Sequence, residues 1–285
     1  MGVIRQKTVL VLGAGASCPY QFPLGVGLVD QVCNELNTTI GGPHFDQRLV
    51  ALGHEAGHKN HFINELRRAR PYSLDAFLET RPEFSDVGKA AIADVLLRAE
   101  ANSTIHTAAI KDDWYRYLLN RFLLLRNVEH YRRQARLLTV VTFNFDRSFE
   151  WVLYERIRAL FGVSDADARV LATEIKIHHV HGLLGEPAWL QPGESPQLTH
   201  YGAHGQDALI AAGAVAVKSI KIVTEEIDQS VLEDVAAALH RAVFVYFIGF
   251  GFDERNLQKL GTPASVAKAS RVRATVFKIT PLAGC

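Results

Sequence analysis

Cysteine is scarce in this chain, which argues against a disulfide-stapled secreted protein. Only three occur among 285 residues, at Cys18, Cys33 and Cys285, and none forms a CxxC pair. Because the number is odd, at least one cysteine has no partner within the chain. We therefore expect a reducing, cytoplasmic setting.

Excess charge and long apolar runs are also missing. The formal net charge is +1, and no basic run is interleaved with aromatic residues, so we expect no direct nucleic-acid binding. No apolar run approaches the roughly 20 residues that cross a bilayer, so we expect no membrane span. The first residues indicate a strand rather than a signal peptide. A hydrophobic content of 48% is enough for a large core, in one big domain or two smaller ones.

The most informative segment is KTVLVLGAGASCPYQFPLG, which runs from Lys7 to Gly25. An apolar strand leads into a glycine-rich turn, and a helix is expected to follow. Gly13 and Gly15 let backbone N–H groups approach an anion at the start of that helix. The segment predicts a nucleotide site, although such a turn can also serve only to pack a strand on a helix.

The segment departs from the usual dinucleotide fingerprint in two ways. Cys18 stands where a third glycine is expected, and no acidic residue ends a second strand about 20 residues further on. Glu35 has roughly the right spacing but belongs to a helical pattern of apolar residues. An ordinary nicotinamide dehydrogenase is thus disfavoured, whereas nucleotide binding is not.

Alternating strand and helix patterns predict an α/β protein with a Rossmann-like parallel sheet. We predict the sheet domain at residues 1–37 and 137–285, with a helical insertion at 38–136. Expected helices are 46–69, 73–79 with Ser73 as cap, 86–101, 112–131, 148–161, 228–241 and one from about Glu254. Expected strands are 136–143, 174–180, 218–224, 242–250 and 273–279.

Polar residues follow four of the predicted strands, and ligands of open α/β sheets bind at such strand ends. The first group is the GAGAS turn and the second is TFNFD. The third is the His181–Gly182 pair, and the fourth is GFGFDERN. The residues concerned are Gly13 to Ser17, then Thr142, Asn144, Asp146, His181, Gly249, Gly251, Asp253 and Asn256.

These four groups, in this order, resemble the SIR2-like (sirtuin-fold) family of NAD-consuming proteins. The segment YSLDAFLE is also similar to the family's helical insertion. The resemblance implies that Asn144 positions an attacking water, Asp146 helps to orient the ribose region, and His181 acts as base or hydrogen-bond partner to the ribose hydroxyls. The diphosphate of NAD would be held by Gly13, Ala14, Gly15, Ala16 and Ser17.

The resemblance implies four further cofactor-binding residues, Thr142, Gly249, Gly251 and Asp253. Of these, Gly249 and Gly251 would border the adenosine half of NAD. Phe22 and Pro23 are expected near the nicotinamide side, and Cys18 as a packed core thiol. These residue types suit the chemistry, because nicotinamide leaves as a neutral base. An amide and a near-neutral imidazole supply positioning and proton relay.

One family feature is missing, and it changes the expected reaction. Protein-deacylating sirtuins carry a zinc module built on cysteine thiolates, but this chain has no cysteine between Cys33 and Cys285. We therefore expect no metal, and NAD hydrolysis to nicotinamide and ADP-ribose rather than deacylation. The chain also resembles bacterial SIR2-like proteins that lack the module. This resemblance implies an antiphage effector that acts as a homo-oligomer or with a defence-system partner.

Other interpretations stay open. Asn144 and Asp146, or Asp253 and Asn256, could only cap the helices that follow them, and His181 could be an ordinary turn residue. A binding module could sense NAD or ADP-ribose without turnover.

A zinc protease is a further alternative. The HEAGH segment, His54 to His58, matches the H-E-x-x-H pattern of such proteases, with Glu55 as base and Glu79 as a third ligand.

Overall fold

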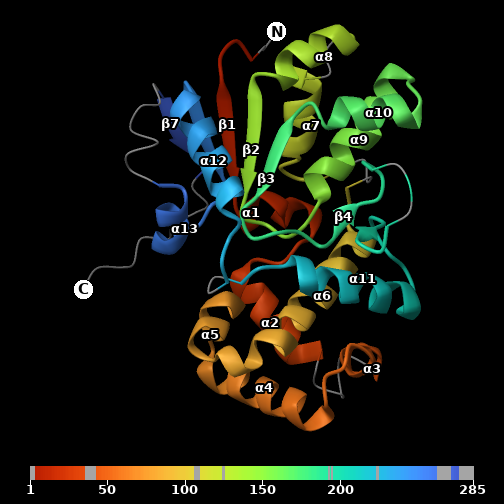
Figure 1. Ribbon diagram of the computed structural model, residues 1–285, viewed down its shortest axis with the longest axis vertical. Helices are drawn as coiled ribbons and strands as arrows, with labels where there is room; N and C mark the ends of the chain where they lie inside the picture. Colours follow the sequence, from red (N-terminus) through yellow and green to blue (C-terminus); the bar gives the residue numbers. More distant parts are fainter. Residues whose placement is uncertain are drawn as a thin grey trace.

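The central element is a parallel sheet. The computed structural model describes residues 4–35, 43–105, 110–123, 126–191, 193, 195–222, 225–261 and 271–275. Within them, five parallel strands have the order β3-β2-β1-β6-β7. Their bounds are β1 (Thr8–Leu12), β2 (Leu138–Thr142), β3 (Lys176–His179), β6 (Phe244–Ile248) and β7 (Arg271–Ala274). The α/β class and a Rossmann-like sheet are thereby confirmed (Figure 1).

Alternate residues of β1 explain how the sheet is covered. Val9 and Val11 belong to a core cluster with Val235 and Leu239 of α12 (Gln229–Arg241). Leu10 and Leu12 belong to the second cluster, which contains apolar residues of α9 (Ser148–Phe161). All five strand residues are buried, as expected for a strand covered by helices on both faces.

Most of the chain between β1 and β2 is helical. Figure 1 shows α2 to α6 grouped below the sheet, with α7 and α8 beside it. The bounds are α2 (Gly25–Glu35), α3 (Pro43–Ala51), α4 (Ala56–Ala69), α5 (Leu74–Thr80), α6 (Ser85–Asn102), α7 (Trp114–Leu118) and α8 (Val128–Ala135). A single apolar cluster continues from Leu10 through these helices, so the division into two domains stays a prediction from the sequence.

A buried ion pair ties the helical region to the sheet. The Arg147 side chain is fully buried, and its Nη2 lies 2.6 Å from Glu100 Oε2 at the end of α6. Arg147 also donates to the carbonyl oxygens of Gly185 and Thr199, at 3.2 and 3.1 Å. Removing one partner of such a pair would leave the other charge buried and unpaired.

Two predicted helices are in fact interrupted. The expected helix at 46–69 breaks between α3 and α4, where Gly53 adopts a φ of +94°. The expected helix at 112–131 becomes α7, a π-helical segment η3 (Leu119–Leu123) and α8, which begins after the capping residue Asn127. The apolar residues keep a helical spacing across both breaks, because the residues on either side face the same core. The sequence pattern therefore predicted one continuous helix in each case.

The predicted strand at 218–224 is wrong. Lys218 and Ser219 end α11 (Gln206–Ser219), residues 220–222 form no strand, and 223–224 lie outside the described residues. Ile220 and Ile222 are buried while Lys221 between them is more exposed, so an extended loop reproduces the alternation expected of a strand.

Several other elements agree with expectation. Helix α9 has the predicted bounds, α12 and α13 (Glu254–Lys259) are present, and Ser73 caps α5 by accepting a bond from the Ala76 N–H. Strand β7 starts before the predicted 273–279, whose last residues lie outside the described chain. The sequence patterns missed α1 (Ala14–Ser17), η1 (Cys18–Tyr20), η2 (Pro82–Phe84), α10 (Asp165–Ala172), α11, β4 (Glu186–Pro187) and β5 (Leu198–Thr199).

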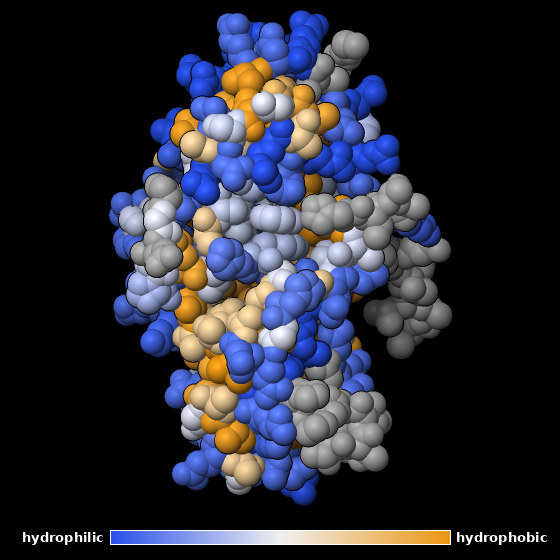
Figure 2. Space-filling view, turned by 90° about the vertical axis from the view of Figure 1, so that its right-hand side faces the viewer, coloured by the Kyte–Doolittle hydropathy of each residue, from blue (hydrophilic) through white to orange (hydrophobic). Residues whose placement is uncertain are grey.

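The surface is mainly hydrophilic on the face opposite α12 and α13. Figure 2 shows this face, with apolar residues gathered in an upper patch and along one lower edge. Leu160 of α9 and Val170 of α10 are more than half exposed. Across the described ranges, no helix has both the length and the apolar character needed to cross a bilayer.

Candidate active site at the carboxyl ends of the strands

The predicted residues meet at the point where the strand order reverses. Strands β1 and β6 are neighbours, and Gly13 follows the first while Gly249 follows the second. A Cβ on Gly13 would lie 2.6 Å from the Gly249 carbonyl oxygen, and a Cβ on Gly249 would lie 2.0 Å from the Ala16 nitrogen. Only glycine allows this approach, and ligands of open α/β sheets bind at such a reversal.

The backbone N–H groups of the glycine turn already donate hydrogen bonds to backbone carbonyls. The Gly13, Gly15 and Ala16 N–H groups donate to the carbonyls of Ile248, Gly249 and Gly13, at 3.1, 3.0 and 2.8 Å. The first helical segment, α1, covers only Ala14–Ser17. In this geometry the glycines join two strand ends, and binding of a diphosphate by residues 13–17 stays a prediction.

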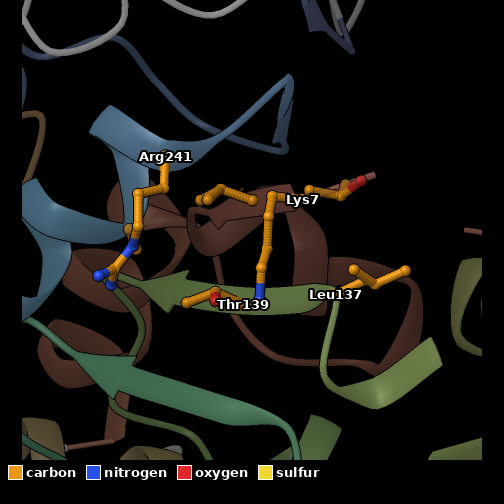
Figure 3. Close-up of a pocket in the computed structure, with 7 residues that line it drawn as sticks. Lys7, Leu137, Thr139 and Arg241 are labelled. Carbon is orange, nitrogen blue, oxygen red and sulfur yellow. The ribbon is translucent and has the colours of Figure 1, made fainter. Parts of the chain in front are cut away.

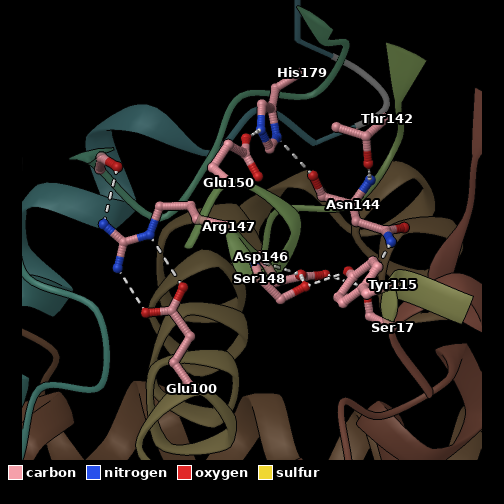
Figure 4. Close-up of polar contacts among 11 residues, drawn as sticks. Ser17, Glu100, Tyr115, Thr142, Asn144, Asp146, Arg147, Ser148, Glu150 and His179 are labelled. Atoms are coloured by element: carbon pink, nitrogen blue, oxygen red, sulfur yellow. Dashed lines mark hydrogen bonds and ion pairs between the residues drawn. The ribbon is translucent and has the colours of Figure 1, made fainter. Parts of the chain in front are cut away.

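Asn144 lies against that turn with its amide fixed. Its Nδ2 donates to the Gly13 carbonyl oxygen at 3.0 Å. It also donates to Ser17 Oγ at 3.1 Å (Figure 4). Since a carbonyl can only accept, Nδ2 must face Gly13, which sets the orientation of the amide. No hydrogen bond to Asn144 Oδ1 is found among the described residues, so this oxygen can accept one from a ligand or water.

Asp146 holds the neighbours of Asn144. Its Oδ2 accepts from Ser17 Oγ at 2.7 Å, and its Oδ1 accepts from the N–H and the hydroxyl of Ser148. The carboxyl group is buried, which raises its pKa, while the serine hydrogen bonds oppose the rise. The cavity beside Ser17, Asn144 and Asp146 is about 10 Å³, which is far too small for a nucleotide.

Helix α7 completes this cluster, although no sequence pattern predicted that its aromatic residues lie at the site. The Tyr115 hydroxyl lies 2.7 Å from Ser148 Oγ, and Trp114 Nε1 donates to the Ala16 carbonyl at 2.7 Å. Neither aromatic residue stands near a strand end in the sequence, so spacing alone could not place them. We call Ser17, Tyr115, Asn144, Asp146 and Ser148 the closed cluster.

A histidine next to the predicted one fixes the backbone of Asn144. His179 Nδ1 lies 3.0 Å from the Asn144 carbonyl oxygen, and His179 Nε2 lies 2.5 Å from Glu150 Oε1. A proton on each ring nitrogen satisfies both acceptors. Burial lowers the His179 pKa, but the Glu150 charge and these bonds outweigh it and raise the pKa overall. The strand-end pattern in the sequence predicts His181 as a site residue and does not include His179.

His181 lies beside the same strand end but is differently placed. Its ring packs against Phe143 and Phe145, with centroids 5.6 and 6.3 Å apart, on either side of Asn144 in sequence. Its Nε2 lies 3.3 Å from Asn256 Oδ1, whereas its buried Nδ1 has no partner in the described part of the chain. Burial, aided by the Lys259 charge, lowers the His181 pKa to about 4. The ring is therefore neutral near pH 7.

The next residue, Gly182, must be glycine. It has a φ of +74°, and a Cβ there would lie 2.0 Å from the Ser219 carbonyl oxygen. The tight turn presses residues 181 and 182 against the end of α11, and the Lys221 N–H donates to the His181 carbonyl at 2.8 Å. This explains the histidine-glycine pair without reference to a ligand.

The other predicted residues have mixed placements. Thr142 is buried, and its hydroxyl accepts from the Asn144 N–H at 3.1 Å. Asp253 is exposed and caps α13 by accepting from Arg255 and Asn256, so the capping interpretation holds for it. Gly251 is exposed with open space around it. Phe22 is in the core, and Pro23 and Cys18 are half-buried.

The zinc-protease alternative loses its geometric basis. His54 and Glu55 precede α4, which begins at Ala56, so His54 and His58 do not share a face of one helix. Gly53 ends the preceding turn, and Glu55 stands at the N-cap. Among the described residues, no group of three or more His, Cys, Asp and Glu side chains gathers in a way that suits a metal ion.

A separate cavity of about 230 Å³ lies at the opposite, amino-terminal ends of β1 and β2 (Figure 3). Its polar lining residues are Lys7, Thr8, Thr139 and Arg241, and the Lys7 ammonium donates to the Arg136 carbonyl at 2.7 Å. No residue predicted for the nucleotide site lines it.

Comparison with known proteins adds no family to this geometry. Neither a protein-family model nor a curated protein sequence matches the chain.

Proposed function

We propose that this chain is a sirtuin-like NAD hydrolase that cleaves the nicotinamide–ribose bond with water. One observation carries the proposal: the Asn144 amide is fixed at the strand-order reversal, with His181 at the neighbouring strand end. Among the described residues, none forms a hydrogen bond with Asn144 Oδ1. The resemblance of the sequence motifs to SIR2-like proteins supplies the substrate.

The roles follow from the contacts. Asn144 Oδ1 accepts a hydrogen bond from the attacking water and so orients its lone pair toward the ribose carbon. Asp146 positions Ser17, which with the Gly13 carbonyl holds the amide of Asn144. His181, with Nδ1 unprotonated, accepts a hydrogen bond from a ribose hydroxyl. Positioning matters most here, because nicotinamide leaves without needing a strong acid.

The test is product analysis. Purified protein incubated with NAD is expected to release nicotinamide and ADP-ribose, separated by chromatography. Asn144→Ala is expected to lower the rate by about 100-fold or more, a typical loss for a positioned catalytic group. Release that survives both Asn144→Ala and His181→Ala would contradict the assignment.

The second candidate is a sensor that binds NAD or ADP-ribose without turnover. The His181 pKa of about 4 favours it, since a base works best with a pKa near the operating pH. Tight binding of NAD without any nicotinamide release would select this function. A role in antiphage defence is proposed on the family resemblance alone.

A further inference from the structure

Unpartnered polar groups lie on both sides of a seam between two helices next to His181. Asp75 Oδ1 on α5 and Lys259 Nζ on α13 are buried atoms with no hydrogen-bond partner in the described chain, as is His181 Nδ1. Buried polar atoms are nearly always bonded in native proteins, so three neighbouring exceptions need an explanation.

Helix geometry shows that Asp75 and Lys259 belong to one seam. Asp75 and Glu79 are one turn apart on α5, and Arg255 and Lys259 are one turn apart on α13. Arg255 forms an ion pair with Glu79 across the two helices. Because each pair shares a helix face, Asp75 and Lys259 lie one helical turn away from this ion pair, between the same two helices. We call the Arg255–Glu79 ion pair the closed rung. We call Asp75 and Lys259, whose Oδ1 and Nζ have no partner in the described chain, the open rung.

The charges around the open rung support that placement. Burial raises the Asp75 pKa to about 6, while Lys259 and Arg255 act to lower it and Asp253 acts to raise it. Burial lowers the Lys259 pKa, and Asp75 opposes this effect. Lys259 also acts on His181, so the open rung and the proposed catalytic imidazole lie within reach of each other's charge.

We propose that Asp75 and Lys259 form the ligand-contacting half of the site that faces His181, and that they bind a phosphorylated sugar. The Asp75 carboxyl accepts from a sugar hydroxyl, and the Lys259 ammonium donates to a phosphate oxygen. The closed rung holds the two helices at the spacing this needs. This inference rests on the proposed function, because it takes the ribose and diphosphate of NAD as the ligand.

An anionic ligand at Lys259 would also act on His181. Lys259 disfavours the protonated imidazole, so a phosphate that neutralises the ammonium raises the His181 pKa toward the range of an effective base. Binding and proton acceptance are thereby coupled at the same lysine.

The experiment measures ADP-ribose binding by calorimetry, with the histidine rings followed by NMR. Asp75→Asn and Lys259→Met are each expected to weaken binding about tenfold, as for loss of a charge-assisted hydrogen bond. Lys259→Met is also expected to raise the His181 pKa. The matched control is Lys176→Met at the exposed start of β3, which is expected to change binding less than about twofold.

Binding within about twofold of the parent in both Asp75→Asn and Lys259→Met would overturn the inference, even if the His181 pKa rises. Lys259→Gln replaces Lys259→Met if the latter does not fold. A parent protein that fails to bind ADP-ribose also overturns it. If the parent and variants bind as expected but no nicotinamide is released from NAD, the hydrolase proposal falls and this site stands, because ADP-ribose lacks the bond to be cleaved.

Discussion

The two sides of the candidate site differ in how their polar atoms are satisfied. In the closed cluster around Asp146, both carboxylate oxygens and both Asn144 amide hydrogens are bonded within the protein. On the other side, His181, Asp75 and Lys259 each keep a buried atom that has no hydrogen-bond partner within the described ranges. The first arrangement fixes positions, and the second leaves groups ready for a ligand.

The largest expected effect is on the closed cluster. Asp146→Ala removes the acceptor for Ser17 and Ser148 and leaves buried donors unpaired, so we expect the free energy of unfolding to fall by about 3 kcal/mol. Urea unfolding followed by circular dichroism measures this change. A loss below about 1 kcal/mol would show that the cluster is not the rigid side of the site.

The next effect is a pH dependence that comes from His181. Its pKa is near 6.5 when unfolded and about 4 when folded, so the unfolded state binds more protons between these values. The free energy of unfolding therefore drops as the pH falls from 6.5 to 4, by about 3 kcal/mol at most. Unfolding curves of the parent and His181→Gln across this range test it, since only the parent should show this contribution.

His179 should behave in the opposite way, because its folded pKa is raised. Its contribution to stability is present below the unfolded pKa and is lost as the pH rises through the folded one. Glu150→Gln removes the carboxylate that holds the ring, so we expect a lower His179 pKa by NMR. We also expect about a tenfold lower kcat for nicotinamide release with an unchanged KM. An unchanged His179 pKa would mean that Glu150 does not fix the ring.

The smallest expected effect is on the open side. Asp75→Asn removes a buried charge whose Oδ1 has no partner in the described chain, and burial already disfavours that charge, so the free energy of unfolding should not fall. The same urea titration measures it beside Asp146→Ala. A loss as large as that of Asp146→Ala would erase the distinction between the two sides.

The strand ends illustrate how far the sequence could be interpreted. An apolar run followed by Gly13, and another followed by Asn144, predicted both strands and their polar ends, because burial on both faces demands continuous apolar residues. The short strand predicted at 174–180 placed His181 just beyond the end of β3, although β3 is only partly buried. It could not separate His181 from His179, since both are histidines at one strand end and only their partners differ.

Helical segments were predicted less well where local and tertiary signals disagree. Residues 218–224 alternate in hydrophobicity, yet the alanine-rich stretch before them carries α11 through Ser219. Asp253 is an exposed cap, although its position after β6 made it a candidate ligand-binding residue. Capping and ligand binding call on the same residue types, so composition alone did not distinguish them.

By itself, the sequence determined the parallel sheet, the glycines that follow β1 and β6, and the polar residues at the strand ends, because periodicity and backbone sterics are local properties. Tertiary structure alone decided which polar atoms are bonded and which are left free. That difference depends on side chains such as Tyr115, Glu150, Asp75 and Lys259, which reach the site from helices distant in the chain.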